Sequence, residues 1–256
     1  MTSGSPNGQP SGPPAPRPCD TVDHGPAQPW LTCFAPMVVF LATGFAEPDR
    51  KGGGLPALVG IGYESYPVVY SIRVAATILL LAWSWRSLRG WLGRPTWWPP
   101  LVGLALVVPW IALSVFQRDM GWLMGGTERA GFDPFTHYGT DSVRSSVYLA
   151  LRGLGLVVVV PLVEELFLRG FLMRFVIQEK FWTVPFGTLT TAAAGTCALY
   201  AAGSHPPELA AAVVWFAAIT GIAITTRRPI DCVTAHAATN LALGVYVLAT
   251  GNWWLL

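Results

Sequence analysis

The chain has 256 residues, of which 52% are hydrophobic and only 12% are charged. Soluble domains carry about 25% charged residues, so this composition excludes an ordinary soluble domain and predicts a polytopic membrane protein. The net charge of +2 is too small to indicate a nucleic-acid partner.

The first 29 residues are rich in Pro, Gly, Ser and Asn. This composition buries too little apolar surface to fold, so we expect residues 1–29 to be a disordered tail; a docking role is a second interpretation. The tail has no basic start followed by an apolar run, so it does not resemble a cleavable signal peptide.

The rest of the chain contains long apolar stretches, which predict an all-α bundle of about seven transmembrane helices. The predicted spans are residues 30–45, 68–85, 101–116, 147–176, 184–202, 209–225 and 230–249.

The longest connection, residues 117–145, shows no clear period. Such a connection is often functional, and we expect a lid or a short interfacial segment that carries Trp122 and Met124.

Positive charges give a modest indication of orientation. If the N-terminus is cytoplasmic, the segments on that side hold eight Lys and Arg residues, including Arg174, against six on the other side, including Arg73. We therefore predict a cytoplasmic N-terminus.

The fourth predicted span carries three charges within an apolar run: Glu164, Glu165 and Arg169. A charge at the centre of a bilayer costs about 2.5–3.5 kcal/mol, so the default interpretation is a functional site. Glu165 and Arg169 are four residues apart and are expected to pair. Glu164 lies about 100° around the helix from Glu165 and should face a different neighbour.

Three further polar residues lie in or beside later spans. His205 precedes Pro206, where the helix is expected to break and let the ring turn inward. His236 and Asn240 are four apart and share one helix face. A single such residue often makes only an interhelical hydrogen bond, but the set together indicates chemistry.

These residue types suit hydrolysis of a peptide bond. A carboxylate can serve as general base toward a water that an imidazole orients. A second imidazole and a carboxamide can donate hydrogen bonds to the oxyanion on the attacked carbonyl. The sequence has neither G-x-S-x-G nor H-E-x-x-H.

The motif EE-x-x-x-R, a histidine closing the next span, and H-x-x-x-N occur in this order. Together they resemble the CPBP family (CAAX proteases and bacteriocin-processing enzymes, or Abi family), which are intramembrane glutamate-dependent endopeptidases. The resemblance covers about residues 145–250. It departs at Ala201, because the family usually has an aromatic residue four positions before the histidine, whereas Tyr200 stands five before His205.

A finer resemblance rests on YPVVYSIR, the Trp- and Gly-rich loop before the fourth span, and TGNWW. These segments are similar to the exosortase-associated branch, which accompanies the PEP-CTERM sorting system of Gram-negative bacteria.

The resemblance implies a role for each motif residue, in a site between the fourth, fifth and seventh spans. Glu164 would be the catalytic carboxylate and His205 would help it activate water. His236 and Asn240 would form the oxyanion site, which Glu165 and Arg169 would support.

The same resemblance implies a domain division and partners. Residues 30–145 would form the N-terminal spans and long loop, and residues 146–256 the catalytic bundle. No cofactor is expected. The partners would be membrane lipid, a membrane-associated protein or peptide substrate, and components of an exosortase system, in the bacterial inner membrane.

Two other interpretations remain open. A metal-dependent hydrolase would use Glu164, Glu165, His205 and His236 as zinc ligands. Alternatively, the protein is not an enzyme but a proton-coupled transporter or a scaffold for a sorting system. The lack of an internal repeat argues against the transporter.

Overall fold

The computed structural model describes residues 24–50, 52–121, 131–140 and 142–256. Within these residues the protein is all-helical, with no strand, which confirms the predicted fold class of a polytopic membrane protein. The helices are α1 (Ala35–Gly44), α2 (Gly54–Leu58), α3 (Tyr66–Trp83), α4 (Trp85–Leu92), α5 (Pro99–Asp119), α6 (Pro134–Tyr138), α7 (Val143–Leu154), α8 (Val160–Glu165), α9 (Met173–Phe175), α10 (Thr191–Ser204), α11 (Leu209–Thr226) and α12 (Pro229–Thr250).

Five helices in the described part of the chain are long and apolar enough to cross a membrane: Tyr63–Trp83, Pro99–Asp119, Val143–Phe175, Pro206–Thr226 and Pro229–Thr250. The first predicted span corresponds to a shorter apolar helix, Trp30–Gly44. The predicted count of seven is therefore not confirmed.

The fifth predicted span, residues 184–202, differs most from the structure. Its helix α10 starts only at Thr191, because Pro185 and the left-handed Gly187 (φ 79°) hold the preceding segment in turns. The side chain of Thr190 then caps the helix by accepting a hydrogen bond from the backbone N–H of Ala193 at 3.2 Å.

The structure also describes parts of the predicted tail and of the predicted connection at residues 117–145. His24, inside the predicted tail, donates its backbone N–H to the carbonyl of Trp182 at 2.8 Å. In the predicted connection 117–145, α6 and the start of α7 are helical. Residues 1–23, together with Trp122 and Met124, lie outside the described residues.

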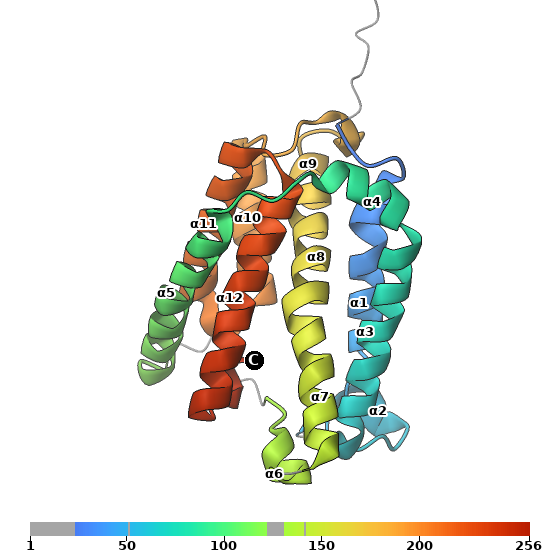
Figure 1. Ribbon diagram of the computed structural model, residues 1–256, viewed down its shortest axis with the longest axis vertical. Coiled ribbons are helices and arrows are strands. Elements are labelled where there is room, and N and C mark those ends of the chain that lie inside the picture. Colours follow the sequence, from blue (N-terminus) through green and yellow to red (C-terminus); the bar gives the residue numbers. More distant parts are fainter. Residues whose placement is uncertain (1–23, 51, 122–130, 141) are drawn as a thin grey trace, which may run out of the picture.

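The helix Val143–Phe175 stands between two packed groups of helices (Figure 1). On one side, α1 packs against α3, and buried side chains of both meet those of α8. On the other side, α5, α10, α11 and α12 share a larger core. Different faces of the central helix therefore contact the two groups of helices.

Small residues set the closest approach between α5 and α12. A Cβ added at Gly103 would lie 2.0 Å from the carbonyl oxygen of Ala235, so only glycine fits there. Thr239 donates a hydrogen bond to the Gly103 carbonyl at 2.7 Å across the same contact. This packing fixes the face of α12 that carries His236 and Asn240.

The central helix is not uniformly α-helical. It contains two π-helical segments, η3 (Gly155–Val159) and η4 (Leu166–Leu172), which flank α8. Pro161 lacks the N–H that an α-helix would use toward residue 157, which weakens the regular ladder at the first segment. Such π-bulges occur frequently at functional sites, and here they bracket Glu164 and Glu165.

Candidate active site

One cavity of about 210 Å³ is lined by four of the sequence-predicted site residues. Glu164 lies on α8, and His205 directly follows the last residue of α10. His236 and Asn240 lie on α12. Side chains far apart in sequence, from the fourth, fifth and seventh predicted spans, therefore line one cavity. Residues of α1, α3, α5, α7 and α11 and the C-terminal residues Leu255 and Leu256 also line it.

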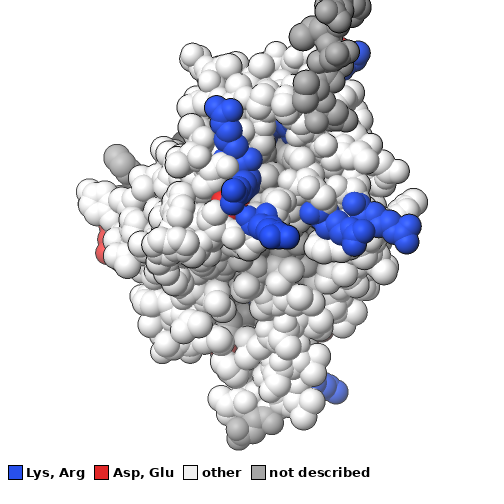
Figure 2. All heavy atoms as spheres, turned by 45° about the horizontal axis from the view of Figure 1, so that its top comes forward, with Lys and Arg blue, Asp and Glu red and all other residues white. Residues whose placement is uncertain are grey.

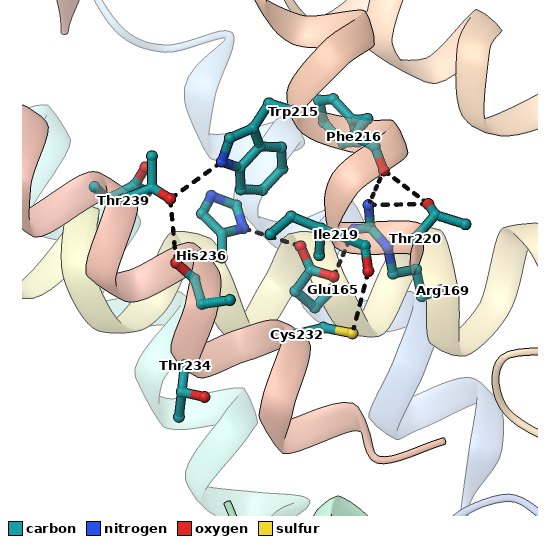
Figure 3. Close-up of polar contacts among 12 residues, drawn as sticks. Glu165, Arg169, Trp215, Phe216, Ile219, Thr220, Cys232, Thr234, His236 and Thr239 are labelled. Carbon is teal, nitrogen blue, oxygen red and sulfur yellow. Dashed lines mark hydrogen bonds and ion pairs between the residues drawn. The ribbon is translucent and has the colours of Figure 1, made fainter. Parts of the chain in front are cut away.

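Glu165 does not line this cavity but lies behind it, buried with two partners. Its Oε2 pairs with Arg169 Nη1 at 2.5 Å, which confirms the predicted pair, and its Oε1 contacts Nδ1 of His236 at 3.0 Å (Figure 3). Because both partners come within hydrogen-bond distance, the buried carboxylate is neutralised and held in place.

Arg169 extends this network to the neighbouring helix α11. Its Nη2 donates to the carbonyl of Phe216 at 3.0 Å and to the hydroxyl of Thr220 at 3.4 Å (Figure 3). Thr220 in turn donates to the Phe216 carbonyl at 2.8 Å. The network therefore ties the central helix to α11 and, through His236, to α12.

The contact with Glu165 fixes which proton His236 carries. A carboxylate only accepts hydrogen bonds, so Nδ1 of His236 is the donor. When the ring is neutral, Nε2 then bears the lone pair; when the ring is protonated, Nε2 also becomes a donor. The ring is held against Trp215, with centroids 4.5 Å apart and the planes at 68°.

The hydroxyl of Ser204 fixes which nitrogen of His205 carries the proton. The Ser204 hydroxyl donates its single proton to the carbonyl of Tyr200 at 2.7 Å, so at the 2.8 Å contact with His205 the ring Nδ1 is the donor. In the neutral ring Nε2 is then the acceptor. Trp110 and Phe216 hold the ring from its sides, with centroids at 5.4 and 5.7 Å.

Asn240 is oriented by the first π segment. Its Nδ2 donates to the carbonyl of Leu156 at 2.9 Å, within Gly155–Val159, where the helical hydrogen-bond pattern is altered. A carboxamide nitrogen carries two N–H groups, so one is used in orientation and the second can donate to another acceptor.

Several cavity residues were not predicted from the sequence. They are aromatic or basic residues of surrounding helices and one serine: Tyr70, Arg73, Trp110, Arg152, Ser204 and Trp215. A signal for Arg152 was present, because Arg152, Leu156, Val160 and Glu164 recur every four positions and all line the cavity. Trp110 and Trp215 gave no such signal, since tryptophan is common in apolar helices of this chain.

Across the described residues, no group of three or more His, Cys, Asp or Glu side chains is arranged to hold a metal ion. Glu165, one of the four residues considered as zinc ligands, is bound to Arg169 and His236 in this arrangement.

Residues 146–242 match the family model described as "Type II CAAX prenyl endopeptidase Rce1-like". The match contains all six predicted site residues and supports the resemblance to the CPBP family over this part of the chain. The matched family is one of proteases, and together with the apolar helices it indicates a multi-pass membrane protein. No curated protein and no solved structure matches the chain.

Proposed function

We propose that this protein is an intramembrane endopeptidase of the CAAX-protease type that hydrolyses a peptide bond of a membrane-associated protein. The observation that carries the proposal is the cavity of about 210 Å³ lined by Glu164, His205, His236 and Asn240. The family match over residues 146–242 supports the reaction class.

In the proposed reaction, Glu164 acts as general base and takes a proton from a water molecule. Nε2 of His205, the acceptor nitrogen of the neutral ring, accepts the second hydrogen of that water and orients its lone pair. The water oxygen attacks the scissile carbonyl carbon, and the carbonyl oxygen becomes an oxyanion. Glu164 then returns the proton to the leaving amine as the C–N bond breaks.

Two donors are proposed for the oxyanion. The second N–H of Asn240 Nδ2 is one, and Nε2 of His236 is the other when the ring is protonated. Glu165 orients this ring because its carboxylate accepts a hydrogen bond from Nδ1. Arg169 compensates the charge of Glu165 and keeps the carboxylate turned toward His236.

The test is cleavage in cells that express the full chain. Comparative peptidomics of wild type and Glu164→Gln, which is nearly isosteric, should reveal a membrane protein that stays uncleaved in the variant. Loss of a general base lowers rates by about 10²–10⁴-fold. Glu179→Gln, at an exposed glutamate outside the cavity, is the matched control and should retain cleavage.

Other outcomes separate the remaining interpretations. Unchanged cleavage in Glu164→Gln would contradict the proposed mechanism. A scaffold would keep its partner binding without Glu164, and a transporter would lose proton-coupled uptake rather than cleavage. Activity that disappears with a strong chelator and returns with zinc would favour the metal-dependent alternative.

Location and partners belong to the same proposal. We propose the bacterial inner membrane, with a lipid-anchored or hydrophobic-tailed protein as substrate. The segments YPVVYSIR and TGNWW support assignment to the exosortase-associated branch, with components of that sorting system as partners.

A further inference from the structure

Two side chains that line the cavity come from outside the part of the chain that matches the family model. Leu255 and Leu256 lie beyond residue 242, where the match ends, and both contribute to the cavity wall. Figure 1 shows this end of the chain between α12 and the central helix, on which Glu164 lies. The wall at this position is therefore a feature of this chain that the family match does not include.

A left-handed glycine turns the chain back toward the cavity. Gly251 ends α12 with φ 71°, a conformation that residues with a side chain rarely adopt, and its N–H donates to the carbonyl of Val247 at 2.8 Å. The short helix η7 (Trp253–Leu255) follows directly. As a result Leu255 is only 4% exposed and packs in the core that α5, α10, α11 and α12 share.

Side-chain packing, rather than backbone hydrogen bonding, holds this segment in place. The N–H groups of Leu255 and Leu256 donate at 3.1 Å to the carbonyls of Asn252 and Trp253, within the segment itself. In the described part of the chain, no hydrogen bond joins the backbone of residues 253–256 to another helix. The segment can therefore move outward while the hydrogen bonds of the long helices stay intact.

The contacts that seat the segment from outside are also made by side chains and one glycine. The ring centroid of Trp253 lies 6.0 Å from that of Phe135 on α6, and Arg118 of α5 lies 4.7 Å from the ring centre of Trp254. Gly131 packs directly on Trp253: a Cβ built there would overlap the carbonyl oxygen of Trp253 and lie 3.1 Å from its Cβ. These contacts separate together if the segment swings away.

The size of the cavity requires such a movement. Its volume is about 210 Å³, whereas pockets that bury most of a drug-sized ligand measure about 300–1,000 Å³. A peptide placed for hydrolysis has residues on both sides of the cut bond, so it is at least as large as such a ligand. With Leu255 and Leu256 in place, the cavity is therefore too small for the substrate of the proposed reaction.

We propose that residues 252–256 form a strap that closes the cavity and swings out about Gly251 to admit a peptide. Leu255 and Leu256 occupy space that the substrate needs, so they control access to Glu164. A substrate with apolar side chains replaces the packing that the two leucines lose, whereas a polar one does not, so the strap favours apolar substrates. The inference rests on the proposed peptidase function for the identity of the guest but not for the movement.

The test measures access to the cavity without using cleavage. Val160 lines the cavity four residues before Glu164 and takes no part in the proposed reaction, so Val160→Cys places a thiol there. The full chain, with its native cysteines replaced, is reconstituted in lipid nanodiscs and exposed to a bulky maleimide. Mass spectrometry of the fragment that contains residue 160 gives the labelling rate at this one position.

A disulfide between Gly131→Cys and Trp253→Cys tests whether the strap has to move. Disulfides need Cβ atoms about 3.5–4.5 Å apart, and the separation of 3.1 Å reaches this range when residue 131 shifts by about 0.5 Å away from the strap. Oxidation should lower labelling at residue 160 at least about tenfold, because labelling proceeds through the open state, and dithiothreitol should restore it. Each single-cysteine variant is the control and should not respond to the oxidant.

A weakened strap should have the opposite effect. Leu255→Ala should raise labelling at residue 160 about tenfold or more, a typical effect of truncating a buried leucine. Leu248→Ala, at an exposed leucine of α12 outside the cavity, is the matched control. A chain that keeps only the native Cys197, buried where α10 contacts Thr220 of α11, reports on the bundle as a whole, and its labelling should not change with Leu255→Ala.

Two results would overturn the strap. Equal labelling at residue 160 in the oxidised and reduced forms would show a fixed wall, which needs no movement. A parallel rise at residue 160 and at Cys197 in Leu255→Ala would show that the whole bundle has loosened.

The two proposals fail in different ways. If labelling follows the cross-link but no form of the protein cleaves a peptide, the strap stands and the peptidase function does not. If the oxidised and reduced forms cleave peptides at the same rate, and Glu164→Gln cleaves none, the peptidase function stands and the strap does not.

Discussion

At the residue scale, the positions of single protons decide what each polar side chain can do. The hydroxyl of Ser204 donates to the Tyr200 carbonyl and so makes Nδ1 of His205 a donor. Glu165 does the same for Nδ1 of His236. Each neighbour therefore fixes the role of Nε2 in its histidine. Ser204 is not part of the sequence motifs, and Glu165 is, but the motif does not show that it contacts His236.

Ser204 is accordingly predicted to be a positioning residue for His205. Ser204→Ala removes the contact at 2.8 Å, and the ring can then adopt the other tautomer and rotate. We expect kcat to fall about three- to tenfold, the worth of one hydrogen bond, while KM changes little.

Conservative replacement distinguishes positioning from folding. Ser204→Thr keeps the hydroxyl and should restore most of kcat, with a thermal unfolding midpoint equal to that of the alanine variant. If Thr and Ala variants have the same kcat, the hydroxyl does not act through His205.

At the element scale, the central helix brings the site together because it is irregular. Gly155 begins the first π segment and allows α3 to approach: a Cβ there would lie 2.0 Å from the hydroxyl oxygen of Tyr70. The second π segment, Leu166–Leu172, contains Arg169 and follows Glu165 directly. A regular helix of the same sequence would place these side chains on other faces.

Gly155→Ala is therefore expected to destabilise the protein by about 1–3 kcal/mol, because the added methyl group displaces Tyr70 or the helix. Gly153→Ala is the matched control, since a Cβ there meets no atom within 4 Å. The control should be neutral or slightly stabilising, because alanine favours helix over glycine.

Thermal unfolding in detergent measures both variants. Adding Tyr70→Phe to Gly155→Ala should recover part of the loss, since it removes the atom that the new Cβ contacts most closely. Equal midpoints for the two single alanine variants would contradict the packing argument.

At the scale of the whole molecule, exposed basic side chains gather on one end of the bundle. Figure 2 shows Lys and Arg spread over the face at this end, with almost no Asp or Glu among them. Exposed arginines of α4, of the α4–α5 link and of the α11–α12 turn lie there: Arg86, Arg89, Arg94, Arg227 and Arg228. By the positive-inside rule, we propose that this end faces the cytoplasm.

The structure corrects the charge count behind this orientation at one position. Arg174 was counted with the cytoplasmic segments, but it is buried and donates to the carbonyls of Val184 at 2.8 Å and Gly170 at 2.9 Å. Arg73, which was counted on the other side, forms an ion pair with Glu47 at 2.9 Å. The orientation therefore rests on the exposed arginines alone.

Single cysteine substitutions test this orientation in a background where the native cysteines are replaced. Arg228→Cys should react with a membrane-impermeant maleimide only after the cells are permeabilised. Arg144→Cys, exposed near the opposite end of the central helix, should react in intact cells. The reverse pattern would place the basic end outside.

The sequence by itself determined the membrane class, most helices and four of the polar residues that line the cavity. Long apolar runs leave few alternatives to helices, and charges within them stand out because each is costly. The Glu165–Arg169 pair was predictable because it is local, four residues apart on one helix. The histidine and asparagine motifs were predictable because polar residues are rare in their spans.

Only the tertiary structure decided which groups those residues contact. The bond from His236 to Glu165 and that from Asn240 to Leu156 join residues 71 and 84 positions apart. The register of Arg152 with Glu164 depends on a π-helical turn whose cause lies in packing against α3 as well as in local sequence. Periodicity assumes a regular helix, so it cannot report where neighbouring helices make the helix irregular.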